Sequence, residues 1–141
     1  MSQPRRPESV LVVIHTPGLE CLLLERVAPV GFWQSVTGTL KWQETAVDCA
    51  VREVREETGI EPDGLIDARV EQRFPILPEW RNRYAPDVTE NVEHLWYLPI
   101  AEIVPVTINP NEHLQYRWAP LEEAIEAVTS WTNRAALERL R

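Results

Sequence analysis

The sequence predicts an α/β (α+β) protein, a mixed β-sheet with helices packed on its faces. Three observations lead to this prediction. Patterns typical of strands come first, one long amphipathic helical pattern follows, and further strand patterns precede two short helical patterns. Elements of both kinds bury an apolar face against a neighbour, so this order favours a layered arrangement.

Two apolar runs near the start predict a β-hairpin. Residues 8–15 contain the apolar run 10–14 and lead into the turn Pro17-Gly18, and residues 20–26 are the expected partner strand. We interpret 27–30 as a loop and 31–37 as an extended segment, with Trp33 and Val36 as apolar anchors. Gly38 is expected to interrupt that segment.

Residues 45–58 are the clearest helix. Thr45 followed by Asp48 resembles a capping box, and Gly59 is a typical C-terminal stop. Apolar residues recur at helical spacing and form one stripe. These are Ala46, Val47, Ala50, Val51 and Val54.

The remainder alternates strands and loops. We expect strands at 65–74, 93–100, 102–106 and 115–118, an irregular loop at 75–87, and helices at 121–128 and 132–140. Thr132 or Ser130 is the N-cap of the last helix. The chain has 141 residues without a repeat or a linker, which predicts one domain over 1–141.

Charge and composition exclude several classes of function. The net charge of −8 disfavours binding to a nucleic acid polymer, which depends on neutralising phosphates. No apolar run approaches the roughly 20 residues of a membrane span, so we expect no membrane partner. Cys21 and Cys49 are too few for a disulfide scaffold, which favours the cytoplasm. The oligomeric state stays open.

The long helix has an acidic face as well as its apolar stripe. Glu53, Glu56 and Glu57 lie at i, i+3 and i+4 and project together. Taken alone, they are equally consistent with a solvated face, because Arg52 and Arg55 add positive charge. A structural Ca²⁺ site is disfavoured, since the chain has no EF-hand loop.

The surrounding spacing favours a catalytic metal site. Nine positions at fixed spacing match the Nudix box, and the chain therefore resembles the Nudix hydrolases. These positions are Gly38, Glu44, Arg52, Glu53, Val54, Glu56, Glu57, Gly59 and Ile60.

The residue types in this motif suit metal chemistry. Glycine at 38 permits a positive φ or a close backbone approach to the helix. The carboxylates offer the hard oxygen ligands that Mg²⁺ prefers, with Mn²⁺ as an alternative. Arg52 can hold one carboxylate by a bidentate hydrogen bond. Glu44 and Gly59 have structural roles in the motif.

The resemblance implies an α/β/α sandwich that cleaves a phosphoanhydride bond with a metal ion on the phosphates. The implied metal ligands are Glu53, Glu56, Glu57 and Glu112, and the implied catalytic residues are Arg52, Glu56, Glu57 and Glu112. Glu112 would be a ligand or the base that activates water. The identity of the base and the number of metal ions stay open. His113, next to Glu112 in the sequence, is either a base or a structural residue.

Segments outside the box resemble one group of Nudix enzymes, the bacterial dihydroneopterin triphosphate pyrophosphohydrolases. The segments are 5–7, 11–14, 32–38, 81–86, 111–114, 116–118 and 130–134. This resemblance implies release of pyrophosphate from dihydroneopterin triphosphate, a step in folate biosynthesis. The implied substrate-binding residues are Arg5, Arg26, Thr37, Phe74 and Ser130. Trp33 is a further candidate, because an aromatic face suits stacking on a bicyclic ring. The chain departs from the group at 41–43, where Lys-Trp-Gln replaces the usual acidic residue and glycine.

Alternatives remain for the substrate and for single residues. The enzyme could act on a (deoxy)nucleoside triphosphate such as an oxidised purine nucleotide or dATP. A non-catalytic nucleotide-binding module is disfavoured, because all the box carboxylates are present. Trp33 is either a stacking or a core residue, and Ser130 is a cap or a ligand contact. The roles of the loop residues Arg81, Arg83 and Tyr84 are not assigned.

Overall fold

The computed structural model describes residues 3–141. Its elements in chain order are β1 (Glu8–His15), β2 (Glu20–Arg26), β3 (Trp33–Gln34), β4 (Val36–Thr39), α1 (Ala46–Thr58), β5 (Ile66–Pro75), the 3-10 helix η1 (Pro78–Arg83), β6 (Glu90–Pro99), β7 (His113–Pro120), α2 (Leu121–Ala127) and α3 (Trp131–Glu138). None of the helices in this range is both long and apolar enough to cross a membrane.

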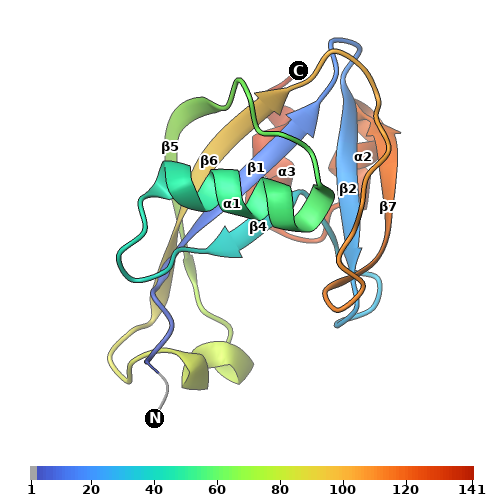
Figure 1. Ribbon diagram of the computed structural model, residues 1–141. Helices are drawn as coiled ribbons and strands as arrows, with labels where there is room; N and C mark the ends of the chain where they lie inside the picture. The colour runs from blue at the N-terminus through green and yellow to red at the C-terminus, as the bar shows by residue number, and fades with distance from the viewer. Residues whose placement is uncertain (1–2) are drawn as a thin grey trace.

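A seven-stranded mixed sheet forms the middle of the fold (Figure 1). The strand order is β3-β2-β1-β6-β5, with β4 paired to β1 and β7 paired to β2. β1 and β6 run parallel, and the other pairs are antiparallel. β1 meets β2 at His15↔Cys21, next to the hairpin turn. Further along, β1 pairs with β4 while β2 pairs with β7 and β3, so the two strands diverge.

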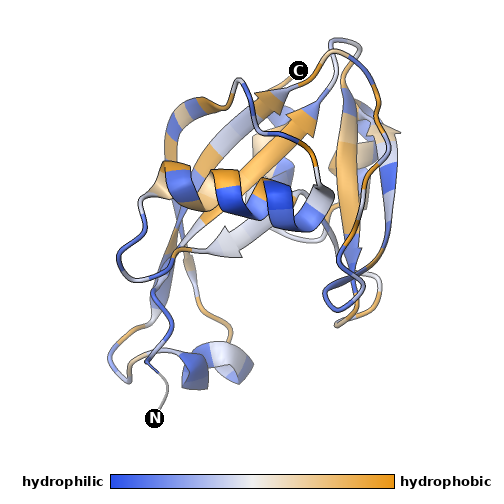
Figure 2. Ribbon diagram, viewed as in Figure 1, coloured by the Kyte–Doolittle hydropathy of each residue, from blue (hydrophilic) through white to orange (hydrophobic). Residues whose placement is uncertain are grey.

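Helices cover both faces of the sheet, α1 on one and α2 with α3 on the other (Figure 1). Val10 and Val12 of β1 pack with Val54 of α1, whereas Leu11 packs in the same cluster as Leu137 of α3. A strand buried on both faces is apolar throughout, which explains the run at 10–14. Figure 2 shows β1 and β2 as largely hydrophobic, while α1 alternates between hydrophobic and hydrophilic residues. The predicted sandwich is confirmed.

The ends of the helices follow the predicted capping residues. The Thr45 hydroxyl accepts a hydrogen bond from the Asp48 amide at 3.2 Å, and α1 begins at the next residue. Gly59 ends α1 in the left-handed region at φ 73°, where glycine has no steric penalty. Of the two candidate caps of α3, Ser130 has this role and accepts from the Asn133 amide at 3.1 Å.

Two predicted strand boundaries are wrong. Gly38 does not interrupt a strand, because it lies within β4 and pairs with Val10. Residues 102–106 form no regular strand, although Val106 is buried on the α1 side. Their backbone is engaged elsewhere, since the Val104 carbonyl accepts from the Trp118 indole at 3.2 Å. Pro105 also lacks the amide that a sheet ladder needs.

The remaining differences are extensions and irregularities. β6 and β7 are longer than predicted, and the loop at 75–87 contains η1. The imperfect alternation of β5 has a cause in its register, which shifts between Asp67 and Glu71. Arg69 has φ 56° there, and its amide donates to the Asp67 carboxylate at 2.8 Å.

Candidate active site

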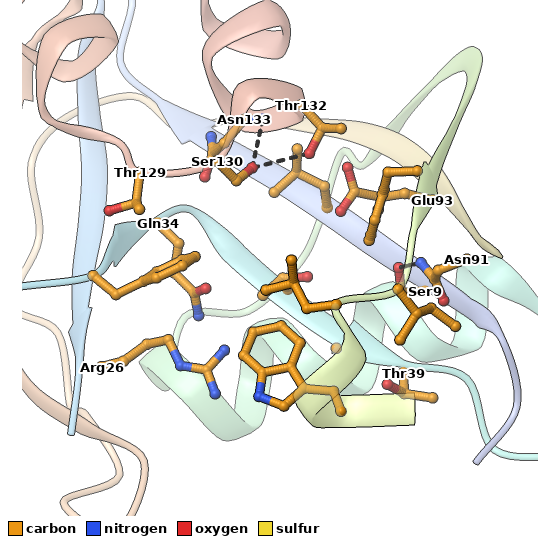
Figure 3. A pocket seen from close by; sticks show the side chains of 18 of the residues that line it. Ser9, Arg26, Gln34, Thr39, Asn91, Glu93, Thr129, Ser130, Thr132 and Asn133 are labelled. Carbon is orange, nitrogen blue, oxygen red and sulfur yellow. Dashed lines mark hydrogen bonds between the residues drawn. The ribbon is translucent and has the colours of Figure 1, made fainter. Parts of the chain in front are cut away.

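An open cleft of about 1040 Å³ contains most of the predicted site residues. One part, the acidic end, consists of Glu53, Glu57 and Glu112. Another, the polar end, lies on the sheet face next to the start of α3 and consists of Ser9, Asn91, Glu93, Thr132 and Asn133. Figure 3 shows the polar end, with Arg26 and Gln34 on the other side of the cleft.

Glu57 is the most deeply buried carboxylate of the acidic end. Its residue is 1% exposed, and neither carboxylate oxygen has a hydrogen-bond partner among the described residues. Burial raises the pKa of Glu57 well above its usual range, and the carboxylates of Glu53 and Glu112 raise it further. A buried, unpartnered carboxylate must bind a proton or a cation to be stable.

Glu53 lies against Gly38 of β4. A Cβ atom at position 38 would lie 2.2 Å from Cδ of Glu53 and 2.5 Å from its Cγ. Of the two roles predicted for this glycine, the close approach is therefore the correct one. The motif needs glycine here because any side chain would displace the carboxylate of Glu53.

Arg52 links several carboxylates. Its Nε and Nη2 atoms each donate to one oxygen of Glu44 at 2.8 Å, which is the predicted bidentate contact. Its Nη1 donates to Glu53 at 2.6 Å and to Glu56 at 3.3 Å. The Arg52 guanidinium lowers the pKa of Glu44 to about 2. The Arg52–Glu44 pair thus anchors the loop before α1 and fixes one oxygen of Glu53.

Glu56 and Glu112 are placed differently from the other two carboxylates. Glu56 is exposed and directed toward Arg52, and it does not line the cleft. Glu112 lies in the loop before β7, where its carbonyl accepts from the Val27 amide at 2.9 Å. Within residues 3–141, no three acidic, histidine or cysteine side chains converge closely enough to bind a metal ion as they stand.

The Glu53–Glu57 pair nevertheless fits a hard divalent cation. Two neighbouring carboxylates, one of them with both oxygens buried and unpartnered, provide the negative charge that such an ion neutralises. Mg²⁺ in particular is usually held by one or two carboxylates together with substrate phosphates and water. A third protein ligand is therefore not required.

Five of the six predicted substrate-binding residues line the cleft, namely Arg5, Arg26, Thr37, Phe74 and Ser130. Trp33 does not, because it packs against the core beneath α2 and α3, which favours the core interpretation. The aromatic rings near Arg26 are instead those of Phe32 and Trp80, whose centroids lie 5.5 and 5.9 Å from its guanidinium carbon. Burial lowers the pKa of Arg26, and Arg83 and Arg5 lower it further.

Three more polar residues of the cleft were either left open from the sequence, as His113 was, or missed. His113 is 3% exposed, and its Nε2 lies 3.7 Å from Oε1 of Glu57. Burial, assisted by Arg26, lowers the pKa of His113 and favours its neutral form. Asn91 and Glu93 of β6 were missed, although they lie two residues apart in a strand and therefore on one face. Arg83 lines the cleft, as does Tyr84, whereas Arg81 does not.

Known proteins resemble this chain over nearly its whole length. The family model described as NUDIX domain matches residues 5–140. The dihydroneopterin triphosphate diphosphatase of Escherichia coli (strain K12) is 39% identical over 140 residues, covering 96% of this chain and 92% of that protein. The protein of the same name from Haemophilus influenzae is 36% identical over 146 residues, covering 99% and 90%.

A solved structure of a protein with the same enzyme activity in its name has a closely similar fold. The structure of the E. coli dihydroneopterin triphosphate pyrophosphohydrolase superposes with a TM-score of 0.89 and 38% sequence identity. The match covers 98% of this chain and 97% of that one.

Proposed function

This chain belongs to the Nudix family, and from that premise we propose that it hydrolyses dihydroneopterin triphosphate to dihydroneopterin monophosphate and pyrophosphate. The substrate follows from the names of relatives that match this chain almost from end to end. The observation that carries the chemistry is the Glu53–Glu57 pair in a cleft large enough for a triphosphate and a bicyclic ring. The reaction is a step in folate biosynthesis.

Nudix hydrolases generally depend on a divalent metal, and we propose Mg²⁺ for this chain, held by Glu53 and Glu57. We assign Glu112, which lines the same cleft, and Glu56, which Arg52 contacts, as the further carboxylates that would serve this ion. When bound, the ion offsets the charge of the phosphates and polarises their oxygens. Arg52 keeps the Glu53 carboxylate in place.

Arginines at the cleft provide the rest of the phosphate site. Arg5, Arg26 and Arg83 line it, and the first and last of these lower the pKa of Arg26 by their proximity. Three guanidinium groups that repel one another in the free protein provide a favourable site for a polyanion. Their positive charge lets a protein of net charge −8 attract a triphosphate.

Hydrolysis to these products breaks the anhydride bond between the α and β phosphates. A water molecule forms a new bond to one of these phosphorus atoms, and the bridging oxygen leaves with the other phosphoryl group. The water proton passes to a carboxylate of the acidic end, whose pKa must be high enough to accept it.

Two further assignments belong to this proposal. Both cysteines are buried and free, which supports a cytoplasmic location. We assign Thr37, Phe74 and Ser130 to the substrate site because they line the same cleft.

Three glutamate-to-glutamine variants test the metal site. We expect Glu53→Gln and Glu57→Gln each to lower Mg²⁺-dependent release of pyrophosphate from dihydroneopterin triphosphate by at least 100-fold. Glu61→Gln is the control, because Glu61 is exposed and pairs only with Arg55 among the described residues. Wild-type turnover in Glu57→Gln would contradict the assigned metal role.

A further inference from the structure

The sheet face beneath α2 and α3 changes character along its strands. Leu11 of β1 and Leu95 of β6 are register partners and belong to the apolar core under the helices. Two residues earlier on each strand, the partners are Ser9 and Glu93, which point to the same face. The face is therefore apolar where the helices cover it and polar where it forms the floor of the cleft.

Most of the polar side chains of this floor are satisfied by one another. Asn91 donates from Nδ2 to the Ser9 hydroxyl at 2.8 Å. Asn133 accepts from the Ser35 amide at 2.8 Å and donates to the Ser35 hydroxyl at 3.0 Å. These bonds fix the walls of the polar end, as Figure 3 shows for Ser9 and Asn91.

Glu93 is the only ionisable side chain of this floor, and Thr132 is the neighbour that hydrogen-bonds it. Glu93 is 7% exposed, yet it lines the cleft, and its carboxylate is directed into the space shown in Figure 3. Burial raises its pKa to about 7, and the neighbouring Thr132 lowers it only in part. No basic side chain among residues 3–141 contributes to this balance. A carboxylate so placed lacks a counter-charge and gains most from a ligand that donates hydrogen bonds.

We propose that Glu93 selects the substrate ring, by accepting hydrogen bonds from an edge that carries two adjacent N–H donors. The inference rests on the proposed function and deepens it. A 2-amino-4-oxopteridine has this edge in its amino group and the neighbouring ring N–H. The two donors lie side by side, and a carboxylate binds such a pair as it binds a guanidinium group.

The same chemistry defines which rings are accepted and rejected. Guanine carries the same edge as the pterin, hypoxanthine keeps only the ring N–H, and adenine has a ring nitrogen that accepts instead of donating. Adenine would therefore leave the buried Glu93 carboxylate unpaired. Loss of such a bidentate pair changes affinity by roughly 10- to 100-fold.

The inference can be tested by binding, without turnover. The α,β-methylene analogues of GTP, ITP and ATP resist cleavage at the reactive bond, so calorimetry in Mg²⁺ gives their dissociation constants. We expect the wild-type protein to bind the GTP analogue at least tenfold more tightly than the ATP analogue, with ITP between them. Glu93→Gln should raise the dissociation constant of the GTP analogue by roughly 10- to 100-fold. The dissociation constant of the ATP analogue should change by less than threefold.

Two further variants make the result decisive. Glu90→Gln removes an exposed carboxylate from the same strand and should leave all three constants unchanged. Glu93→Asp keeps the charge on a shorter arm and should retain part of the preference for GTP, which provides a readout if Glu93→Gln folds poorly. An unchanged GTP preference in both Glu93 variants, equal weakening of all three analogues, or no preference in the wild type would overturn the inference.

This experiment separates the inference from the proposed function. If the wild-type protein fails to hydrolyse dihydroneopterin triphosphate but Glu93→Gln still loses the preference for GTP, the proposed substrate is wrong and the role of Glu93 stands. If dihydroneopterin triphosphate is hydrolysed but Glu93→Gln keeps the preference for GTP, the proposed substrate stands and the role of Glu93 is wrong.

Discussion

Gly38→Ala tests whether the close contact between β4 and α1 places the metal-binding carboxylate. An alanine Cβ would lie 2.2 Å from Cδ of Glu53, whereas ordinary contacts begin at 3.4 Å. Since Gly38 has no left-handed φ, the substitution adds a steric clash without backbone strain. Glu53 is held by Arg52 at 2.6 Å, so relief of the clash must break or bend that contact.

The expected displacement of the carboxylate is about 1 Å, and a misplacement of that size costs about 100-fold in rate. The accompanying loss of stability should be about 1–3 kcal/mol, the usual range for overpacking. We would measure kcat for pyrophosphate release, the Mg²⁺ concentration at half-maximal rate, and the urea midpoint. Gly18→Ala is the matched control, because its nearest neighbour would lie at 4.0 Å. A Gly38→Ala enzyme with wild-type kcat and Mg²⁺ dependence would refute the reasoning.

Three further predictions concern charge. Glu57→Gln should raise the melting temperature of the metal-free protein at pH 8 and abolish stabilisation by Mg²⁺, because the raised pKa of Glu57 makes its charge unfavourable; continued Mg²⁺ stabilisation would contradict this. The pKa of Glu44 is lowered to about 2, so its stabilisation, complete above pH 4.5, is lost as pH falls toward 2; urea midpoints of Glu44→Gln should show a smaller loss over this interval. The pKa of Glu93 is raised to about 7, so folding stability should fall between pH 4.5 and 7 by at most about 3 kcal/mol; an equal fall in Glu93→Gln would refute this.

Local patterns predicted the elements whose signals lie in neighbouring residues. The apolar run of β1 and the caps of α1 are such signals, and both predictions are confirmed. Elements that depend on distant partners were predicted less well. The segment 102–106 has the alternation of a strand, but it pairs with no strand of the sheet. Its Val104 carbonyl accepts from the Trp118 side chain of β7, and the residue after the segment, Thr107, donates its amide to the end of α1.

The residues of the candidate site were likewise predicted where the signal is local and missed where it depends on distant parts of the chain. The motif spacing predicted Gly38, Glu53 and Glu57 because they are fixed within one strand–loop–helix unit. Glu93 was missed because it is a single polar residue in a strand. It lies in the cleft only because the start of α3 leaves this part of the sheet face uncovered, which the local sequence does not indicate. Trp33 was left open between stacking on the substrate ring and a core position, and its packing beside β3 and β2 favours the core.

The most direct test of the account is the substrate preference of the purified protein in Mg²⁺. We would compare kcat/KM for dihydroneopterin triphosphate with the values for GTP, dATP and the triphosphate of 8-oxo-deoxyguanosine. The account predicts a preference for the pterin of at least tenfold, about 1.4 kcal/mol of transition-state discrimination. A higher kcat/KM for any of the nucleotides would contradict it and would make this chain a nucleotide pyrophosphohydrolase of the same family.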